Sequence, residues 1–372
     1  MSVTIPTIAC ALALAATASL APAQAEQSQA TTWCNAREAD GVSLDLQISG
    51  CTTVIQSGEV SNSNLASALS NRGNAYRVKG QHDRAIEDLD QAIKLNPNYA
   101  NAFINRGVAY NAKGEYDHAI QDYDQAVKLN PNAAVAYYNR GLAYRAKSQL
   151  DRAIQEFDQV IKLDPNEADA FIKRGITYYA KGQHDHAIQD YDQAIRLNPS
   201  DADVFINRGI AYRAKGQFDR AIQDYDQATK LNPSDAVAYY NRGVAHSAKR
   251  QYDRAIQDYD QAINLKPTDA AFINRGLAYS EKNQLDRAIQ DYDQAIKLNS
   301  NRAVAYYNRG LVYSAKRQYG RAIQDYDQAI KLDPSDADIF HERSLAKAKR
   351  GDKKGADADL AAARRIVPNI GR

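Results

Sequence analysis

The stretch YYNRGLAY, residues 137–144, decides the fold of this 372-residue chain. Tyr137, Gly141 and Tyr144 follow the i, i+4, i+7 spacing of one face of a helix. A glycine inside a helix costs about 1 kcal/mol relative to alanine. A charged Arg140 beside an apolar stripe also needs a partner. Both residues therefore require a structural explanation.

The glycine recurs along the chain at gaps of 34 residues, with one gap of 33. Its copies are Gly73, Gly107, Gly141, Gly175, Gly209, Gly243, Gly276 and Gly310, with Ser344 in the ninth place. In the third copy a second apolar stripe follows the turn around residues 147–149, and Asp164-Pro165 ends it. Each unit is therefore predicted to contain two helices and to stack on its neighbours.

These positions resemble the signature of the tetratricopeptide repeat (TPR) family, of the bacterial exported type. The matching residues in the third unit are Gly141, Tyr144, Ala153, Phe157, Val160 (Ala126 in the preceding unit) and Pro165. The resemblance implies an all-α fold, a right-handed solenoid of about nine helix-turn-helix units whose first helices line a concave groove. The expected units are 66–99, 100–133, 134–167, 168–201, 202–235, 236–268, 269–302, 303–336 and 337–370.

The recurring glycine is expected to let the two helices of a unit approach closely, so that a larger side chain would overpack the contact. The ninth unit departs from the pattern at Ser344 and Leu360 and carries extra charge. It is expected to be the C-terminal cap that a solenoid needs.

The first 25 residues are uncharged and rich in alanine and leucine, and they end on Ala23-Gln24-Ala25. This pattern is typical of a signal peptide cleaved after Ala25, although the start lacks Lys and Arg. We expect a periplasmic or secreted protein that is not an integral membrane protein after cleavage. The alternative is an uncleaved anchor, for which the apolar run is short.

Residues 26–65 precede the repeats and are expected to form an N-terminal cap. Its Ile48, Cys51, Val54 and Ile55 have the apolar spacing of a second helix, and the Ser/Asn-rich stretch EVSNSN, residues 59–64, is expected to be a turn. Two cysteines in an exported chain favour a Cys34–Cys51 disulfide. The alternative is two unpaired, buried thiols.

A row of asparagines precedes the arginines and points away from the glycine stripe, at about 100° per residue. Its members are Asn71, Asn105, Asn139, Asn207, Asn241, Asn274 and Asn308. The row resembles the asparagine ladder of O-GlcNAc transferase, whose amides would suit an extended peptide backbone. The alternative is asparagines that are solvated or bonded to a neighbouring loop. Asn139 has no evident structural role in the sequence.

Three units carry a tyrosine beside the asparagine, at Tyr138, Tyr240 and Tyr307. These aromatic rings are expected to lie toward the groove. With neighbouring aliphatic residues, they would give the groove an apolar character that is typical of a partner site.

The arginine that precedes each glycine is expected to pair with acidic residues of the second helices, such as Asp122 and Asp124, within or between units. A phosphate or carboxylate site is the alternative. If the aspartates do not neutralise the charge of the arginines, the groove is positive and favours an acidic partner. The net charge of the whole chain is only +2, which gives no reason to expect nucleic acid.

The sequence has no phosphate loop, nucleophile elbow or Cys-His arrangement, and it suggests neither an enzyme nor a cofactor or metal site. His184 and His186 are the nearest approach to a metal pair. The sequence therefore predicts a non-catalytic scaffold that binds a protein or extended peptide in the cell envelope. The alternative is an accessory protein for polysaccharide export or modification, with glycan contacts through the tyrosines.

Overall fold

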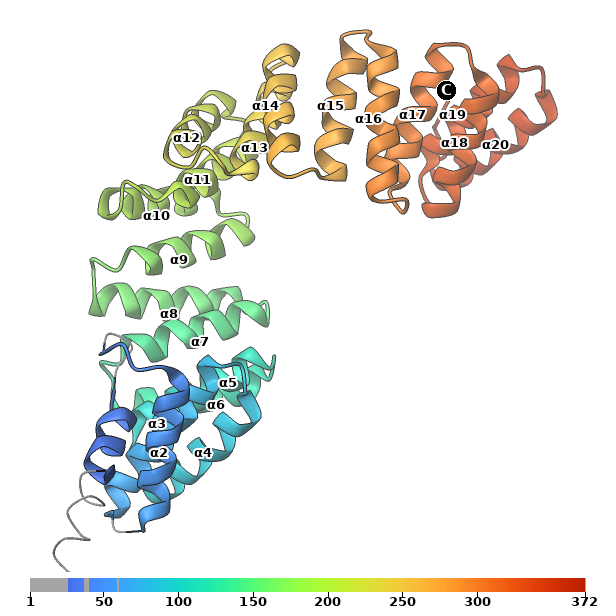
Figure 1. Cartoon of the computed structure of the whole chain (residues 1–372). Coiled ribbons are helices and arrows are strands. Elements are labelled where there is room, and N and C mark those ends of the chain that lie inside the picture. The colour runs from blue at the N-terminus through green and yellow to red at the C-terminus, as the bar shows by residue number, and fades with distance from the viewer. Residues whose placement is uncertain (1–25, 37–39, 59, 372) are drawn as a thin grey trace, which may run out of the picture. The chain divides into compact units, whose positions relative to one another are not determined.

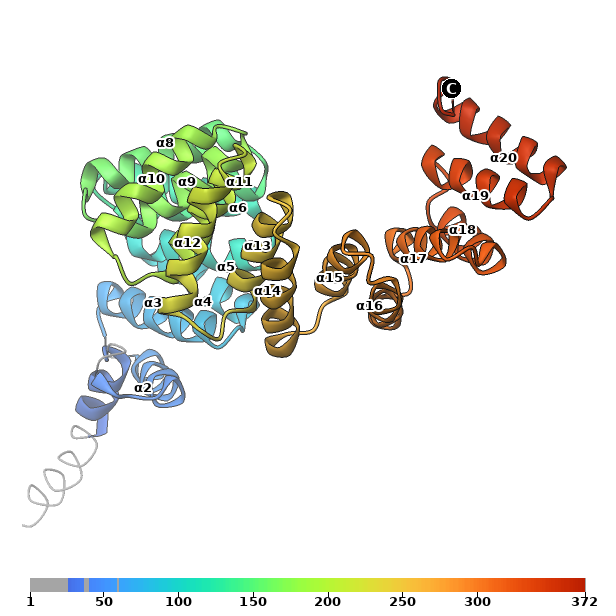
Figure 2. The ribbon, with the colours of Figure 1, turned by 90° about the horizontal axis from the view of Figure 1, so that it is seen from above.

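The computed structural model describes residues 26–36, 40–58 and 60–371 and is all-helical over these residues (Figures 1 and 2). The signal peptide predicted at residues 1–25 lies outside the described residues. The chain divides into two compact units, residues 1–181 and 182–372. No helix of the described residues combines the length and the apolar character needed to span a membrane.

Nine helix pairs follow one another between residues 62 and 366 of the described chain, as the sequence predicts. The first helices are α3 (Asn62–Val78), α5 (Ala100–Ala112), α7 (Ala134–Ala146), α9 (Ala168–Ala180), α11 (Ala202–Ala214), α13 (Ala236–Ala248), α15 (Asp269–Glu281), α17 (Ala303–Ala315) and α19 (Ala337–Lys349). The second helices are α4 (His82–Leu95), α6 (Tyr116–Leu129), α8 (Leu150–Leu163), α10 (His184–Leu197), α12 (Phe218–Leu231), α14 (Tyr252–Leu265), α16 (Leu285–Leu298), α18 (Tyr319–Leu332) and α20 (Lys353–Ile366).

A residue in the left-handed conformation ends each first helix. Glycine occupies this place in some units, for example Gly216 with φ of 72°. Four units have another residue there, at Ser148, Arg250, Asn283 and Arg317, with φ between 57° and 59°. The tight turn is therefore the same in these units, although L side chains rarely adopt this conformation.

The recurring glycine lies close to the second helix, as the sequence predicts; its neighbour there is Leu89 for Gly73 and an aromatic ring in most other units. A Cβ atom added to Gly141 would lie 2.9 Å from the ring of Phe157, and one added to Gly209 would lie 2.6 Å from the ring of Tyr225. Real Cβ atoms do not make such short contacts. The ring of Tyr225 is fully buried, so the glycine is needed for the close approach of the two helices.

The arginine before each glycine joins two units through carboxylates. Arg106 donates to Asp122 in the second helix of its own unit, over 2.6 and 2.9 Å, and to Asp90 in the preceding second helix, over 2.6 Å. Arg208 repeats this arrangement with Asp224 and Asp192. The prediction of arginine–aspartate pairing is confirmed, and the pairing occurs both within and between units. We call the series the arginine ladder.

The same arrangement is found along both compact units. The other arginines of the ladder are Arg140, with Glu156 and Asp124; Arg242, with Asp258 and Asp226; Arg275, with Asp291 and Asp260; Arg309, with Asp325 and Asp293; and Arg343, with Asp359 and Asp327. Arg174 contacts Asp158 of the preceding second helix at 2.6 Å. Arg208 also lies over the rings of Phe205 and Tyr212.

The N-terminal segment has the contacts of a second helix. Helix α2 (Leu44–Ser57) packs against α3, and its Asp45 and Thr52 bond to Lys79 and Arg72 of the first unit. In later units, aspartates make the corresponding contacts. Helix α2 contains Ile48, Cys51, Val54 and Ile55, whose apolar spacing predicts a second helix, and its contacts with the first unit are those of a degenerate second helix.

The turn predicted for residues 59–64 is partly wrong. Residues 62–64 form the first turn of α3, because Ser61 accepts a hydrogen bond from the backbone N–H of Asn64 and caps the helix. The first repeat therefore begins before residue 66.

Cys34, the last residue of the helix formed by residues 26–34, lies against Cys51 of α2, with the two sulfurs 2.13 Å apart. Both residues are buried, with Ala30, Val54 and Ala68 around them. This geometry is that of the predicted Cys34–Cys51 pair.

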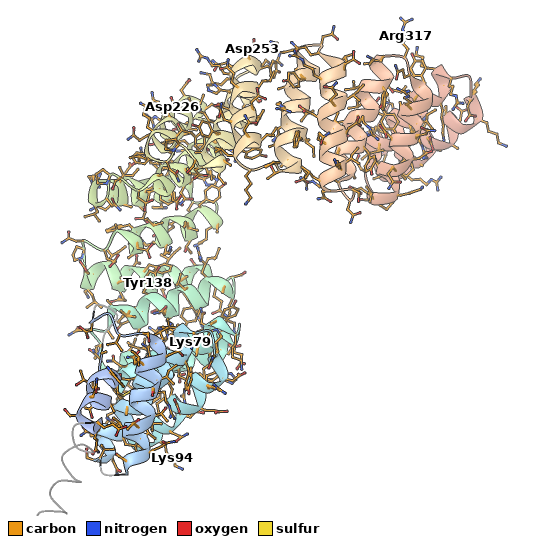
Figure 3. The ribbon with its side chains drawn as sticks, viewed as in Figure 1. Lys79, Lys94, Tyr138, Asp226, Asp253 and Arg317 are labelled. Atoms are coloured by element: carbon orange, nitrogen blue, oxygen red, sulfur yellow. A yellow bond between two sulfur atoms is a disulfide. The ribbon has the colours of Figure 1, made fainter. Side chains whose placement is uncertain are left out.

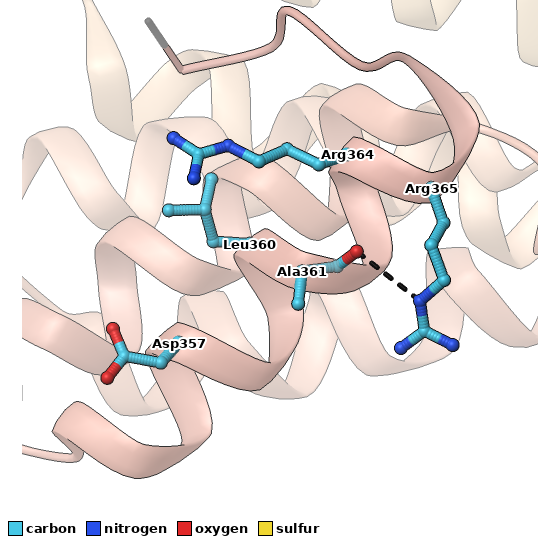
Figure 4. Close-up of a pocket in the computed structure, with 5 residues that line it drawn as sticks. All are labelled: Asp357, Leu360, Ala361, Arg364 and Arg365. Atoms are coloured by element: carbon cyan, nitrogen blue, oxygen red, sulfur yellow. Dashed lines mark hydrogen bonds between the residues drawn. The ribbon is translucent and has the colours of Figure 1, made fainter.

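The ninth unit ends the stack with a more open surface. Leu345, Ile366 and Val367 are each more than 40% exposed. Figure 4 shows a shallow pocket on α20 that is lined by Asp357, Leu360, Ala361, Arg364 and Arg365. Ala361 stands where earlier second helices have the aspartate that receives the next arginine of the ladder.

Candidate partner-binding face

The first helices form one continuous face within each compact unit. Helix α5 contacts α3 and α7, and α13 contacts α11 and α15, whereas successive second helices make no comparable contact among the described residues. Each of the two compact units therefore curves so that its first helices lie on the inner side. We call the inner surface the first-helix face, and it corresponds to the predicted groove.

The seven predicted asparagines lie on the first helices, but their exposure differs. Asn71, Asn105, Asn139, Asn207 and Asn274 are partly exposed, whereas Asn241 and Asn308 are buried, each 7% exposed. The prediction of seven accessible amides is therefore wrong for Asn241 and Asn308.

Several asparagine side chains bond within the protein. Asn139 donates from Nδ2 to the carbonyl of Val135 over 2.8 Å, and Asn241 donates to the carbonyl of Val237 over 2.9 Å. Asn274 donates to the hydroxyl of Tyr240 over 2.8 Å. Asn71 donates to Asn35 in the N-terminal segment. The interpretation of Asn139 as a residue without a structural partner is wrong, because side-chain bonds to the preceding helical turn satisfy the amide.

The three predicted tyrosines are only partly exposed, because each ring packs on an aromatic residue of the second helix. The ring of Tyr138 meets Phe157 edge-on at a centroid distance of 6.0 Å, and Tyr240 lies 6.1 Å from Tyr259. The Tyr307 ring lies 6.2 Å from Tyr326. Each tyrosine therefore offers only part of its surface to a ligand.

Three valines are more exposed than the tyrosines, and the sequence analysis missed them. Val135, Val237 and Val304 are 59%, 52% and 42% exposed. They stand three residues before the tyrosine in each of the three AVAYYNRG units, whereas the other units have Ser, Asn, Asp or Ala at this position. The presence of valine at this position in only three units is the feature of the sequence that indicates these residues.

A pocket lies beside Val135 at the junction of the third and fourth units. It has a volume of about 290 Å³ and is lined by Ala134, Val135, Tyr138, Val160, Asp164, Glu167 and Asp169. The Tyr138 hydroxyl donates to Asp169, the second residue of the next first helix. Figure 3 shows the position of Tyr138 in this part of the fold.

A corresponding pocket lies beside Val237 at the junction of the sixth and seventh units. It has a volume of about 360 Å³ and is lined by Ala236, Val237, Tyr240, Ala262, Lys266, Thr268, Asp269, Ala270 and Ala271. Lys266 and Thr268 occupy the positions of Asp164 and Glu167 in the first pocket. The two pockets therefore share a valine–tyrosine floor and differ in the charge of their rims.

The surroundings of Tyr138 and Tyr307 disfavour ionisation of their hydroxyls. Burial raises the pKa of Tyr138, and the carboxylates of Asp169 and Glu167 raise it further. Burial and the charges of Glu342, Asp338 and Asp336 raise the pKa of Tyr307 to about 12. Both hydroxyls are therefore hydrogen-bond donors at neutral pH.

The arginines of the ladder are not free to bind an anion. Burial opposes the charge of Arg106, but its hydrogen bonds to Asp122 and Asp90 outweigh this effect and raise the pKa of its guanidinium. Burial also raises the pKa of Asp122, against the opposing effect of Arg106. A positive groove was expected only if the arginines were unpaired. Arg106 is paired, so that condition is not met in its repeat.

No set of three or more His, Cys, Asp or Glu residues in the described part of the chain is arranged to hold a metal ion. His184 and His186 lie in the first turn of α10.

Comparison with known families agrees with this geometry. The TPR repeat model matches residues 73–113, 109–146, 141–182, 177–212, 209–250 and 276–317, and the tetratricopeptide repeat model matches residues 236–269 and 303–336. The solenoid of helix pairs places the protein among the α-helical repeat proteins. The chain belongs to the tetratricopeptide repeat family, and a protein-interaction scaffold is the function that this family supports.

Solved structures are similar in fold. A TPR protein from Parabacteroides merdae has 20% sequence identity and a TM-score of 0.52, and the match covers 66% of this chain and 98% of that one. YrrB, described as a TPR protein with an unusual peptide-binding site, has 27% identity and a TM-score of 0.44, with coverage of 53% and 99%. MamA has 30% identity and a TM-score of 0.42, with coverage of 43% and 94%. No curated protein matches the chain.

Proposed function

We propose that the protein is a non-catalytic scaffold that binds a protein or an extended peptide on its first-helix face. The observation that carries this proposal is the repeated exposure of Val135, Val237 and Val304. Solvent-exposed aliphatic side chains at one position of three units, two of them beside pockets, are typical of a surface that is covered by a partner.

The partner of this scaffold need not be acidic. Because the ladder arginines are held by carboxylates, the first-helix face has less free positive charge than the sequence suggests. Apolar contacts in the pockets and hydrogen bonds from partly exposed amides such as Asn105 and Asn207 remain available.

We further propose that the scaffold acts in the cell envelope, as a periplasmic or secreted protein with a Cys34–Cys51 disulfide. The signal-like residues 1–25 and the paired cysteines support this location. N-terminal sequencing of the mature protein tests it: we expect the sequence to start at Glu26. A chain that starts at Met1 would contradict cleavage.

A role in glycan handling has less support. Sugar rings stack on open aromatic faces, whereas the rings of Tyr138, Tyr240 and Tyr307 pack against second-helix aromatic residues. These contacts leave the three rings only partly exposed, so the surface on which a sugar could stack is reduced.

In-cell crosslinking tests the scaffold function. A photoreactive amino acid replaces Val135 on α7 in one variant and Gln155, an exposed residue of α8, in the matched control. We expect a protein to be captured from position 135 and not from position 155. Capture of glycan without protein, or equal capture from both positions, would overturn the proposal.

A further inference from the structure

The pocket beside Val135 has an apolar floor and an acidic rim. Ala134, Val135, Val160 and the Tyr138 ring provide the apolar lining that we call the floor. Asp164, Glu167 and Asp169 come from the end of α8, the loop and the start of α9, and they converge on the same opening.

The rim charge is only partly compensated within the protein. Lys173 lies 3.1 Å from Asp169, and the positive charge of Arg145 lowers the pKa of the Tyr138 hydroxyl. Asp164 and Glu167 are both exposed, and they accept hydrogen bonds from the backbone N–H groups of Asn166 and Asp169. Three carboxylates thus meet one paired lysine at the pocket mouth, which favours a positively charged ligand.

We propose that this pocket receives an apolar side chain followed by a lysine or arginine on a segment of a partner protein. The apolar side chain would cover Val135 and the floor, and the cation would meet Asp164 and Glu167. This inference rests on the proposed scaffold function and adds the chemistry of the segment that the scaffold binds.

The sixth unit supplies a natural comparison within the same chain. Its pocket has the same floor, from Val237 and Tyr240, but the rim has Lys266 and Thr268 in place of two carboxylates. Its remaining acid, Asp269, lies 2.9 Å from Arg302 and accepts a hydrogen bond from Asn299. This pocket therefore fits an apolar side chain without a neighbouring cation.

Short synthetic peptides test the proposal with the purified chain. They place a leucine before lysine, arginine, glutamine or glutamate in an otherwise constant Gly/Ser context, and their affinity is measured by fluorescence anisotropy. We expect the lysine and arginine peptides to bind about three- to tenfold more tightly than the glutamate peptide, with a smaller difference at high salt.

Variants assign this preference to the pocket. Exchanging the rim for that of the sixth unit, Asp164→Lys with Glu167→Thr, is expected to abolish the preference, and Thr can still cap α9 as Thr268 caps α15. A control with the same change in charge, Glu87→Lys with Asp357→Asn, alters exposed acids elsewhere and is expected to keep it. Conversely, Lys266→Asp is expected to add a preference for cations.

The outcomes separate this inference from the scaffold function. Peptide binding without a preference for cations, or a preference that survives the rim exchange, would overturn the acidic-rim proposal but leave the scaffold function standing. The same holds if none of the peptides binds while position 135 still captures a protein in cells. If position 135 captures no protein, both proposals fail.

Discussion

Arg106 Nη1 lies 2.6 Å from Asp90 Oδ1, so the arginine of one repeat is bound to a carboxylate of the repeat before it. The same guanidinium holds Asp122, whose side chain is only 5% exposed, whereas Asp90 is 51% exposed. These two partners are therefore expected to differ strongly in their contribution to stability.

Removing the arginine is expected to be more damaging than removing its exposed partner. Arg106→Leu leaves Asp122 buried without its cation and should lower the free energy of unfolding by about 3–5 kcal/mol. Asp90→Asn should cost less than about 1 kcal/mol. Urea unfolding followed by circular dichroism measures both effects.

The double variant Arg106→Leu with Asp122→Leu tests the cause of that loss. Replacing both charges by apolar side chains should recover most of the stability. If the double variant is as unstable as Arg106→Leu alone, an unpaired buried carboxylate is not the cause.

Gly209→Ala is expected to destabilise the protein, although alanine is the better helix former. The added Cβ would lie 2.6 Å from the buried ring of Tyr225, and overpacking of this kind costs about 1–3 kcal/mol. Gly320→Ala is the matched control, because nothing lies within 4 Å of its added Cβ. That control should be neutral or stabilising by up to about 1 kcal/mol. Thermal unfolding distinguishes the two, and equal behaviour of both variants would contradict the packing role of Gly209.

Arg317→Gly is expected to raise stability. Arg317 has φ of 57°, a conformation that strains an L residue by about 1–2 kcal/mol. Part of the gain is offset because glycine is more flexible in the unfolded chain. The reverse change, Gly216→Ala, introduces this strain and should lower stability. Differential scanning calorimetry would contradict this account if the two changes shifted the melting temperature in the same direction.

Loss of the Cys34–Cys51 link is expected to loosen the N-terminal helices selectively. In the chain-entropy model a loop of this length contributes roughly 3 kcal/mol. Reduction, or the variant Cys34→Ala with Cys51→Ala, should therefore increase amide hydrogen exchange over residues 26–57. Residues 202–366 serve as the internal control and should be unchanged. Equal protection with and without the link would show that it does not stabilise this segment.

Much of the fold can be predicted from the sequence because the same physical demand recurs in each repeat. The glycine and the proline after the second helix recur at intervals of 34 residues, with one interval of 33 between glycines. Serine replaces each of them only once, at Ser344 and Ser300. The apolar spacing of residues 48–55 indicates the helix before the first repeat, but its polar contacts with that repeat were not predicted because they lie four residues out of register. Asp45 and Lys79 are 34 residues apart, whereas the corresponding Asp117 and Lys147 are 30 apart.

The candidate site was harder to predict. A helical wheel gives the direction of Asn139, but not the bond that its amide makes to the carbonyl of Val135. Likewise, the sequence places the arginines on first helices and the aspartates on second helices. It does not show that an arginine such as Arg106 bonds to carboxylates of both its own and the preceding unit. The valine of AVAYYNRG marks a candidate position in the sequence, but the exposed fraction of Val135 also depends on which side of its helix the neighbouring repeats cover.

The arginine ladder also has a direction and an end. Arg343, for example, donates to Asp327 in the second helix of the preceding repeat. The equivalent residue of α20 is Ala361, which has no carboxylate for the arginine of a further repeat. Near-identical repeats on separate molecules could otherwise join head to tail into filaments. Because Ala361 has a methyl group in place of that aspartate, we expect the ninth repeat to form no such ion pair with the first repeat of another molecule.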